Sequence, residues 1–93
     1  NAVLTRDEVV TPWAAAGFEG LAEDDFAGLL RHAPELVLFG SGGRQRFPAP
    51  HLLRPLFEAR IGVETMATAA ACRTFNILSG EGRRVVAALI VVR

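Results

Sequence analysis

The chain has 93 residues, with ten basic and ten acidic side chains and a formal net charge of zero. A neutral chain is a poor candidate for a nucleic-acid-binding protein, because such binding needs a basic surface. Its longest apolar run, residues 85–92, is far shorter than the ~20 residues that span a bilayer, so we expect no membrane-spanning segment. A composition that is 51% hydrophobic and 22% charged predicts a single folded domain over residues 1–93.

Residue usage predicts a bacterial protein in a reducing compartment. The single cysteine excludes an intrachain disulfide, which favours a cytoplasmic location. All ten basic residues are arginine, a bias typical of GC-rich genomes, and the absence of lysine excludes a Schiff-base or P-loop lysine. His32, His51 and Cys72 do not have the spacing of a metal motif, so neither a metal nor a cofactor is predicted. Because the chain starts at Asn1 and not at Met, we expect it to lack an N-terminal segment.

The first half of the chain predicts an extended segment, a helix and a buried strand. Residues 2–13 read as extended and residues 14–20 as a loop. Three acidic residues followed by apolar residues at helical spacing predict a helix over residues 22–32. The continuous apolar run within residues 35–40 is typical of a strand that is covered on both faces.

The second half continues the alternation of helices and strands. A polar loop at 41–50 is followed by a predicted helix at 51–60 and a short strand at 62–65. Residues 68–79 predict a third helix, and residues 85–92 a final buried strand. Such alternation predicts the α/β class, with about three helices packed on a mostly parallel or mixed sheet.

The strongest loop signal is the glycine-rich segment that leaves the buried strand. Gly40 ends this strand, Ser41 and Gly42 follow it directly, and Arg44 comes shortly after. Backbone N–H groups of such a turn can hold an anion, and an arginine can pair with it. The pattern lacks the third glycine of a dinucleotide-binding motif. The alternative is a tight exit from the strand with solvated arginines.

Four further residues complete a candidate pocket. Glu64 ends a predicted strand and Thr68 is the expected N-cap of the next helix, so both should flank one crevice. Cys72, beside Arg73, is either a reactive thiol or a small apolar residue packed against the sheet. Asn76 lies one turn later on the same helix face and either lines the pocket or hydrogen-bonds a neighbouring loop. No set of residues predicts a catalytic centre.

The chain also resembles the Mth-type domain family. The resemblance is carried by residues 62–68, 71–78, 81–83 and 87–90, which read GVETMAT, ACRTFNIL, EGR and AALI. Upstream, residues 34–42 are similar to the strand and glycine loop of the family, and Trp13 falls where the family has a tryptophan. Together these segments extend over about residues 9–92.

The resemblance implies a layered α/β fold with a mixed central sheet, whose last strand runs antiparallel to its neighbours. The family includes assembly factors of respiratory complex I, which implies a protein-binding role. It supplies no catalytic residue. The chain departs from the family at Ala67, where an aspartate is frequent, at Thr65, where an apolar residue is usual, and at Ser41, which stands for threonine.

Three hypotheses about function remain open. The first is a non-enzymatic protein that binds another protein as an assembly or accessory factor, with subunits of a respiratory or other complex as its partners. The alternative is a small-anion-binding domain or weak enzyme whose pocket gathers Gly40, Ser41, Gly42, Arg44, Glu64, Thr68, Cys72 and Asn76. The third is a homodimer that pairs through an exposed sheet edge.

Overall fold

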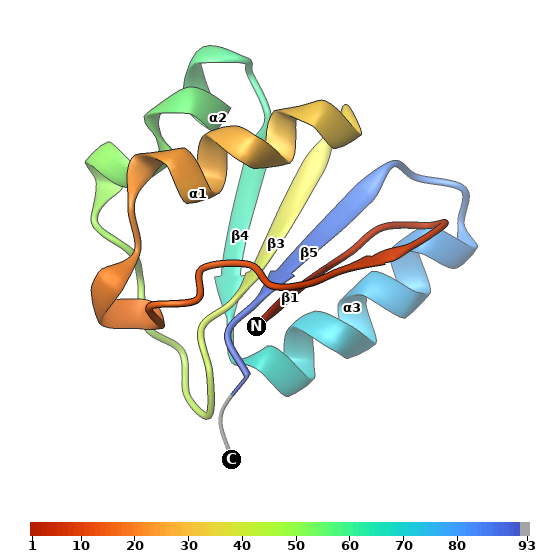
Figure 1. Ribbon diagram of the computed structural model, residues 1–93. Helices are drawn as coiled ribbons and strands as arrows, with labels where there is room; N and C mark the ends of the chain where they lie inside the picture. Colours follow the sequence, from red (N-terminus) through yellow and green to blue (C-terminus); the bar gives the residue numbers. More distant parts are fainter. Residues whose placement is uncertain (92–93) are drawn as a thin grey trace.

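A computed structural model describes residues 1–91 and places helices on both faces of a five-stranded sheet (Figure 1). The strands are β1 (Ala2–Leu4), β2 (Val9–Val10), β3 (Leu36–Gly40), β4 (Gly62–Met66) and β5 (Val85–Leu89). The helical elements are η1 (Phe18–Gly20), α1 (Glu23–Ala27), η2 (Gly28–His32), η3 (Pro50–Leu53), α2 (Arg54–Glu58) and α3 (Thr68–Gly80). Val92, which the sequence places in the last strand, lies outside the described residues.

The sheet is mixed, with the strand order β2-β1-β5-β3-β4. Strand β3 pairs in parallel with both β4 and β5, while β1 is antiparallel to β2 and β5. The α/β class and the mixed sheet are therefore confirmed. The implied orientation of the last strand is wrong on one side, because β5 is antiparallel to β1 but parallel to β3. Helix α3 returns the chain along the sheet, so β5 starts at the same end as β3 and β4.

The N-terminal segment is a hairpin and not one extended stretch. Strands β1 and β2 are joined by a turn over residues 5–8, in which the Thr5 N–H donates to the Glu8 carbonyl at 2.9 Å. The Thr5 hydroxyl also accepts hydrogen bonds from the N–H groups of Asp7 and Glu8. This turn contains neither glycine nor proline, the residues that mark most turns in a sequence.

Two of the predicted helices are partly 3-10 helices. The helix expected at 51–60 begins as η3 and becomes α-helical only at Arg54. Pro55 has no N–H to donate to the carbonyl one turn earlier, which limits regular α-helix at this point. The helix expected at 22–32 changes to η2 at Gly28, a weak helix former.

Two apolar clusters fill the two faces of the sheet. The cluster beneath α1 and α2 contains Val3, Trp13, Ala14, Phe26, Leu29, Val37, Phe39, Leu53, Leu56, Val86, Ala88 and Ile90. The cluster beneath α3 contains Leu36, Leu38, Ala71, Phe75, Val85, Ala87 and Leu89. Strand β3 is buried along its whole length, as predicted. Trp13 is a core residue, since it is 9% exposed and packs edge-on against Phe26 and Phe39.

Asn1 ties the two ends of the described chain together. Its side-chain amide donates to the Ala14 carbonyl at 2.8 Å, and its side-chain oxygen accepts from the Val91 N–H at 2.8 Å. The Asn1 carbonyl accepts from the Trp13 N–H at 3.2 Å. The start of β1 therefore lies next to the segment that follows β5.

Candidate functional site

Gly40 allows α3 to begin close to the end of β3. A Cβ at this position would lie 2.8 Å from Leu89 Cδ2 and 3.0 Å from Thr68 Cα. The Gly40 carbonyl accepts from the Ile90 N–H at 2.8 Å, which holds the chain after β5 against the same point. Gly40, which the sequence suggested as part of a ligand loop, therefore allows the close approach of Thr68 and Leu89.

Ser41 organises the loop from the inside. It is 1% exposed, and its Oγ accepts from the Arg46 N–H at 2.8 Å while donating to the Arg44 carbonyl at 2.6 Å. The Ser41 N–H donates to the Met66 carbonyl at 2.9 Å, which ties the loop to the end of β4. The loop thus folds around the Ser41 hydroxyl.

Thr68 is not the N-cap of α3. Ala67 occupies that position without a side-chain hydrogen bond, and Thr68 is the first helical residue. The Thr68 hydroxyl instead donates to the Ile90 carbonyl and accepts from the Gly42 N–H at 2.9 Å, while the Thr68 N–H donates to the Gly42 carbonyl at 2.9 Å. The Thr68 hydroxyl is therefore bonded to the glycine loop and to the segment after β5, and it does not cap the helix.

A shallow hollow of about 290 Å³ lies where the glycine loop meets the start of α3. It is lined by Gly42, Gly43, Ala67, Thr68, Ala69 and Val91. Two residues of the predicted pocket, Gly42 and Thr68, line it together. The N–H groups of Ser41 and Gly42 donate to protein oxygens, so these two amides are not free to bind an anion.

Of the other candidate residues, Cys72 and Asn76 share a flank of α3 and Glu64 lies elsewhere. Arg44 is exposed, and so is Glu64 on the edge strand β4. The Thr74 hydroxyl contacts Met66 Sδ at 3.6 Å, so that flank of α3 faces β4. Cys72 and Asn76 each lie two residues from Thr74, which is about 160° around a helix of 3.6 residues per turn. The structure therefore does not bring Glu64 together with Cys72 and Asn76.

Cys72 and Asn76 differ in their surroundings. Cys72 is half-buried and packs against the apolar cluster beneath α3, as expected of a small apolar residue. Asn76, one turn later, is exposed to solvent. The flank of α3 that carries both residues is therefore part core and part surface.

An ion pair fastens the same loop to the helical turn η1. Arg46 Nη1 lies 2.9 Å from Glu19 Oε1, and the Arg46 guanidinium stacks over the Phe18 ring at 3.9 Å from its centroid. The hydrogen bond from Arg46 lowers the pKa of the Glu19 carboxyl, and the Arg46 charge adds to this effect. The sequence gives no signal for this contact, because its partners lie far apart along the chain.

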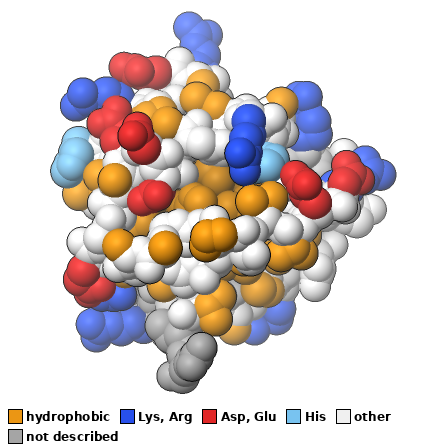
Figure 2. All heavy atoms as spheres, viewed as in Figure 1, with side chains coloured by type: hydrophobic (Ala, Val, Ile, Leu, Met, Phe, Trp, Pro, Cys, Tyr) orange, Lys and Arg blue, Asp and Glu red, His pale blue; other side chains and the backbone are white. Residues whose placement is uncertain are grey.

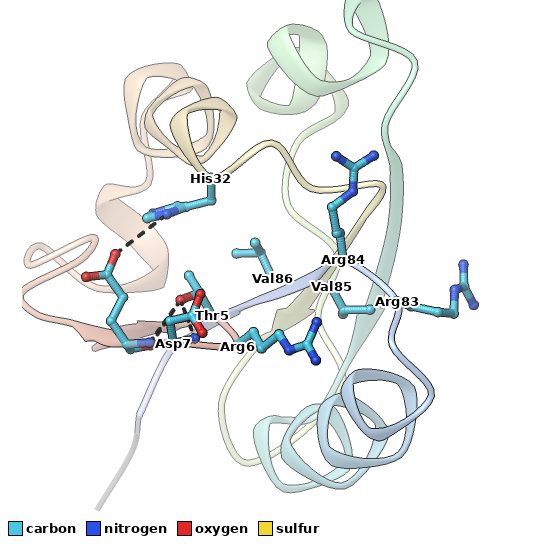
Figure 3. A pocket seen from close by; sticks show the side chains of 9 residues that line it. Thr5, Arg6, Asp7, His32, Arg83, Arg84, Val85 and Val86 are labelled. Atoms are coloured by element: carbon cyan, nitrogen blue, oxygen red, sulfur yellow. Dashed lines mark hydrogen bonds and ion pairs between the residues drawn. The ribbon is translucent and has the colours of Figure 1, made fainter.

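A hollow of about 380 Å³ lies at the opposite end of the sheet and was not predicted (Figure 3). We call it the β5 notch; it is lined by Thr5, Arg6, Asp7, Glu8, His32, Arg83, Arg84, Val85 and Val86. His32 Nδ1 lies 3.9 Å from Glu8 Oε1, and Arg83 Nε lies 3.5 Å from Glu35 Oε1. The adjacent arginines at 83 and 84 are visible in the sequence, but only the fold brings them near the hairpin turn.

Residues 1–91 contain neither a metal-binding cluster nor a membrane-spanning helix. This part of the chain holds no group of three His, Cys, Asp or Glu side chains placed to bind a metal ion. None of its helices is long and apolar enough to cross a membrane.

The curated relatives of the chain carry two kinds of name. One from Bos taurus, 37% identical over 87% of this chain, is named NADH dehydrogenase [ubiquinone] 1 alpha subcomplex assembly factor 3. One from Francisella tularensis, 35% identical over 61% of this chain, is named 13 kDa major membrane protein. The chain spans about half the length of each, 45% and 46% respectively.

Solved structures share the fold over nearly the whole chain. An NMR structure of a Xanthomonas campestris protein superposes with a TM-score of 0.84 at 38% identity, covering 96% of this chain and 67% of that one. A Bordetella pertussis protein described as an Mth938-like domain gives a TM-score of 0.78 at 32% identity, covering 96% of this chain and 72% of that one. Residues 1–90 match the family described as protein of unknown function (DUF498/DUF598). The chain belongs to this family and shares the fold of its Mth938-like relatives.

Proposed function

We propose that the chain is an accessory domain that binds another protein during assembly of a respiratory complex. The proposal rests on the 37% identity, over 87% of the chain, with a protein named as an assembly factor of NADH dehydrogenase. A cytoplasmic location is part of this proposal. The side-chain hydroxyls of Ser41 and Thr68 make internal hydrogen bonds. We therefore assign these two hydroxyls a structural part and not a catalytic one, which accords with a binding role.

Exposed apolar side chains offer surface for such a partner. Val9 is 66% exposed, and hydrophobic side chains gather across the β1–β2 hairpin and beneath α1 in the view of Figure 2. A hollow of about 190 Å³ between the hairpin and η2 is lined by apolar residues such as Val10 and Leu29 and also by charged ones such as Asp24 and Arg31. Apolar surface of this kind is a frequent mark of protein contact sites.

The test is the state of the NADH dehydrogenase in the native host. We expect a deletion strain to contain less assembled enzyme on native gels, and the reintroduced gene to restore it. The tagged full-length protein should retain subunits of this enzyme in affinity capture. Full assembly in the deletion strain, with no subunit retained, would contradict the proposal.

A second candidate is a small-ligand site at the hollow beside α3, which the meeting of Gly42 and Thr68 there favours. An anion at this place would lie at the positive end of a 13-residue helix. Titration with sodium phosphate, followed by ¹⁵N NMR, should then shift the amide signals of Gly43 and Ala69. Unchanged signals at millimolar phosphate would remove this candidate.

A further inference from the structure

The β5 notch exists because the N-terminal hairpin is shorter than the strand that it covers. Pairing between β1 and β5 ends at Leu4 and Ala87, where the hairpin turns away. Pairing between β3 and β5 continues to Val85 and Val86. These two residues therefore have a strand on one side and the notch on the other.

The backbone at the start of β5 is suited to an added chain. The Arg84 carbonyl accepts from the Glu35 N–H at 2.9 Å and so faces β3. Because successive backbone groups of a strand point to opposite sides, the Val85 carbonyl faces the notch. The Val85 N–H donates to the Arg83 carbonyl at 3.1 Å, so the Val85 carbonyl is the backbone group of this residue with which an extended peptide can pair.

Two arginines of the notch are open to an acidic ligand. Arg6, Arg83 and Arg84 line it together with Asp7 and Glu8, but Arg83 is paired with Glu35. Glu8 lies beside His32. No carboxylate of residues 1–91 forms an ion pair with Arg6 or Arg84. Both guanidinium groups are therefore available to a ligand.

Arg6 and Arg84 lie on opposite faces of β5. Val85 packs in the cluster beneath α3 and Val86 in the cluster beneath α1 and α2. Figure 3 draws Arg6 on the Val85 side of β5 and Arg84 on the Val86 side. Consecutive side chains of an added strand would also point to opposite faces, so two adjacent acidic residues would meet one arginine each.

We infer that the β5 notch binds a short, extended, acidic segment of a partner polypeptide, which donates a backbone hydrogen bond to the Val85 carbonyl and directs its carboxylates to Arg6 and Arg84. This inference rests on the proposed protein-binding function and specifies the chemistry of the partner. The volume of about 380 Å³ lies within the range of roughly 300–1,000 Å³ usual for ligand pockets.

The test is an NMR titration of the purified chain with a blocked peptide, acetyl-Val-Glu-Asp-Val-amide. We expect the amide signals of Arg6, Val85 and Val86 to shift. The double variant Arg6→Gln, Arg84→Gln should bind roughly ten-fold more weakly, as the loss of two exposed ion pairs implies. The matched variant Arg54→Gln, Arg73→Gln changes the net charge equally at exposed sites outside the notch and should bind like the wild type.

Control ligands test separately whether the carboxylates and the peptide backbone are needed for binding. The peptide acetyl-Val-Gln-Asn-Val-amide lacks both carboxylates and should bind weakly. Sodium succinate and sodium phosphate should not shift the NMR signals of the Val85 and Val86 amides, because neither supplies a peptide backbone. Equal binding by the Gln-Asn peptide, equal loss in the two double variants, or the same shifts with succinate or phosphate would overturn the inference.

Affinity capture from the host separates this inference from the proposed function. If the wild type retains respiratory subunits and the Arg6→Gln, Arg84→Gln variant retains them equally, the notch is not the contact and the proposed function stands. If the peptide binds the notch but the wild type retains no subunit, the notch is a peptide site and the proposed function fails.

Discussion

At the scale of single residues, Thr68 joins the start of α3 to two other segments. Its hydroxyl accepts from the Gly42 N–H and donates to the Ile90 carbonyl. We expect Thr68→Val to lower the free energy of unfolding by about 1–3 kcal/mol, because the change keeps the shape but leaves half-buried polar groups unpaired. Urea denaturation measures this loss.

The control for this change is Thr68→Ser, which keeps the hydroxyl. It should retain most of the stability of the wild type. If the serine variant were as unstable as the valine variant, the methyl group and not the hydrogen bonds would account for the loss.

Glu19 makes stability depend on pH through its contact with Arg46. The pKa of Glu19 is lowered in the folded protein from its ordinary value of 4.5. The stabilisation of the folded protein by the Glu19 carboxylate is therefore present in full above pH 4.5 and is lost as the pH falls through the lowered pKa.

The variant Glu19→Gln removes this pH dependence. We expect its melting temperature to be below that of the wild type at pH 7, with the two values converging as the pH falls through the lowered pKa of Glu19. Parallel melting curves at every pH would show that the carboxylate charge has no part in the contact.

At the scale of elements, the approach of α3 to β3 depends on the glycine at position 40. An added Cβ would press on Leu89 and on the Thr68 backbone. We expect Gly40→Ala to destabilise the fold by about 1–3 kcal/mol, because the backbone there cannot move without shifting the helix. Urea denaturation, with the NMR signals of α3 as a local readout, checks this.

Gly80→Ala, at the end of α3 that lies away from Gly40, is the matched control. A Cβ there meets nothing within 4 Å, so the change should stabilise the protein, by about 0.4–1 kcal/mol. A loss of stability in this variant similar to that of Gly40→Ala would point to a general cost of replacing glycine.

The elements that the sequence predicts well are those whose pattern is local. The apolar runs of β3 and β5 and the long apolar face of α3 mark these elements directly. The hairpin is missed because residues 5–8 contain neither glycine nor proline and each strand is very short. The direction of β5 relative to β3 depends on how α3 packs, which no local pattern encodes.

The candidate site follows the same division. Gly42 and Thr68 meet because each follows a parallel strand, and such strands end at one edge of the sheet. Cys72 and Asn76 point away from β4 because of the rotation of α3, which the sequence leaves free. The β5 notch joins residues from both ends of the chain, so only tertiary structure reveals it.

At the scale of the whole molecule, β4 is the longer of the two edge strands, five residues against two in β2. An antiparallel pairing of two copies centred on Glu64 would set two carboxylates opposite each other, which is unfavourable. We therefore expect a monomer, and we expect Glu64→Val to increase self-association. Analytical ultracentrifugation at several concentrations measures both.

The control for the edge strand is Glu81→Val, which removes one exposed charge in the turn after α3. It should remain as monomeric as the wild type. A wild-type dimer at low concentration would instead support pairing of copies through this edge.

The clasp that Asn1 forms has a consequence for chain connectivity. Because Asn1 bonds to both Ala14 and Val91, the two ends of the described chain are neighbours in space. A short linker that joins them, with new ends opened in the exposed turn at Gly82, would give a circular permutant with every strand neighbour preserved. We expect this permutant to fold to the same sheet, judged by its NMR spectrum. A permutant that folds in this way would show that the same sheet forms when the strands are synthesised in a different order.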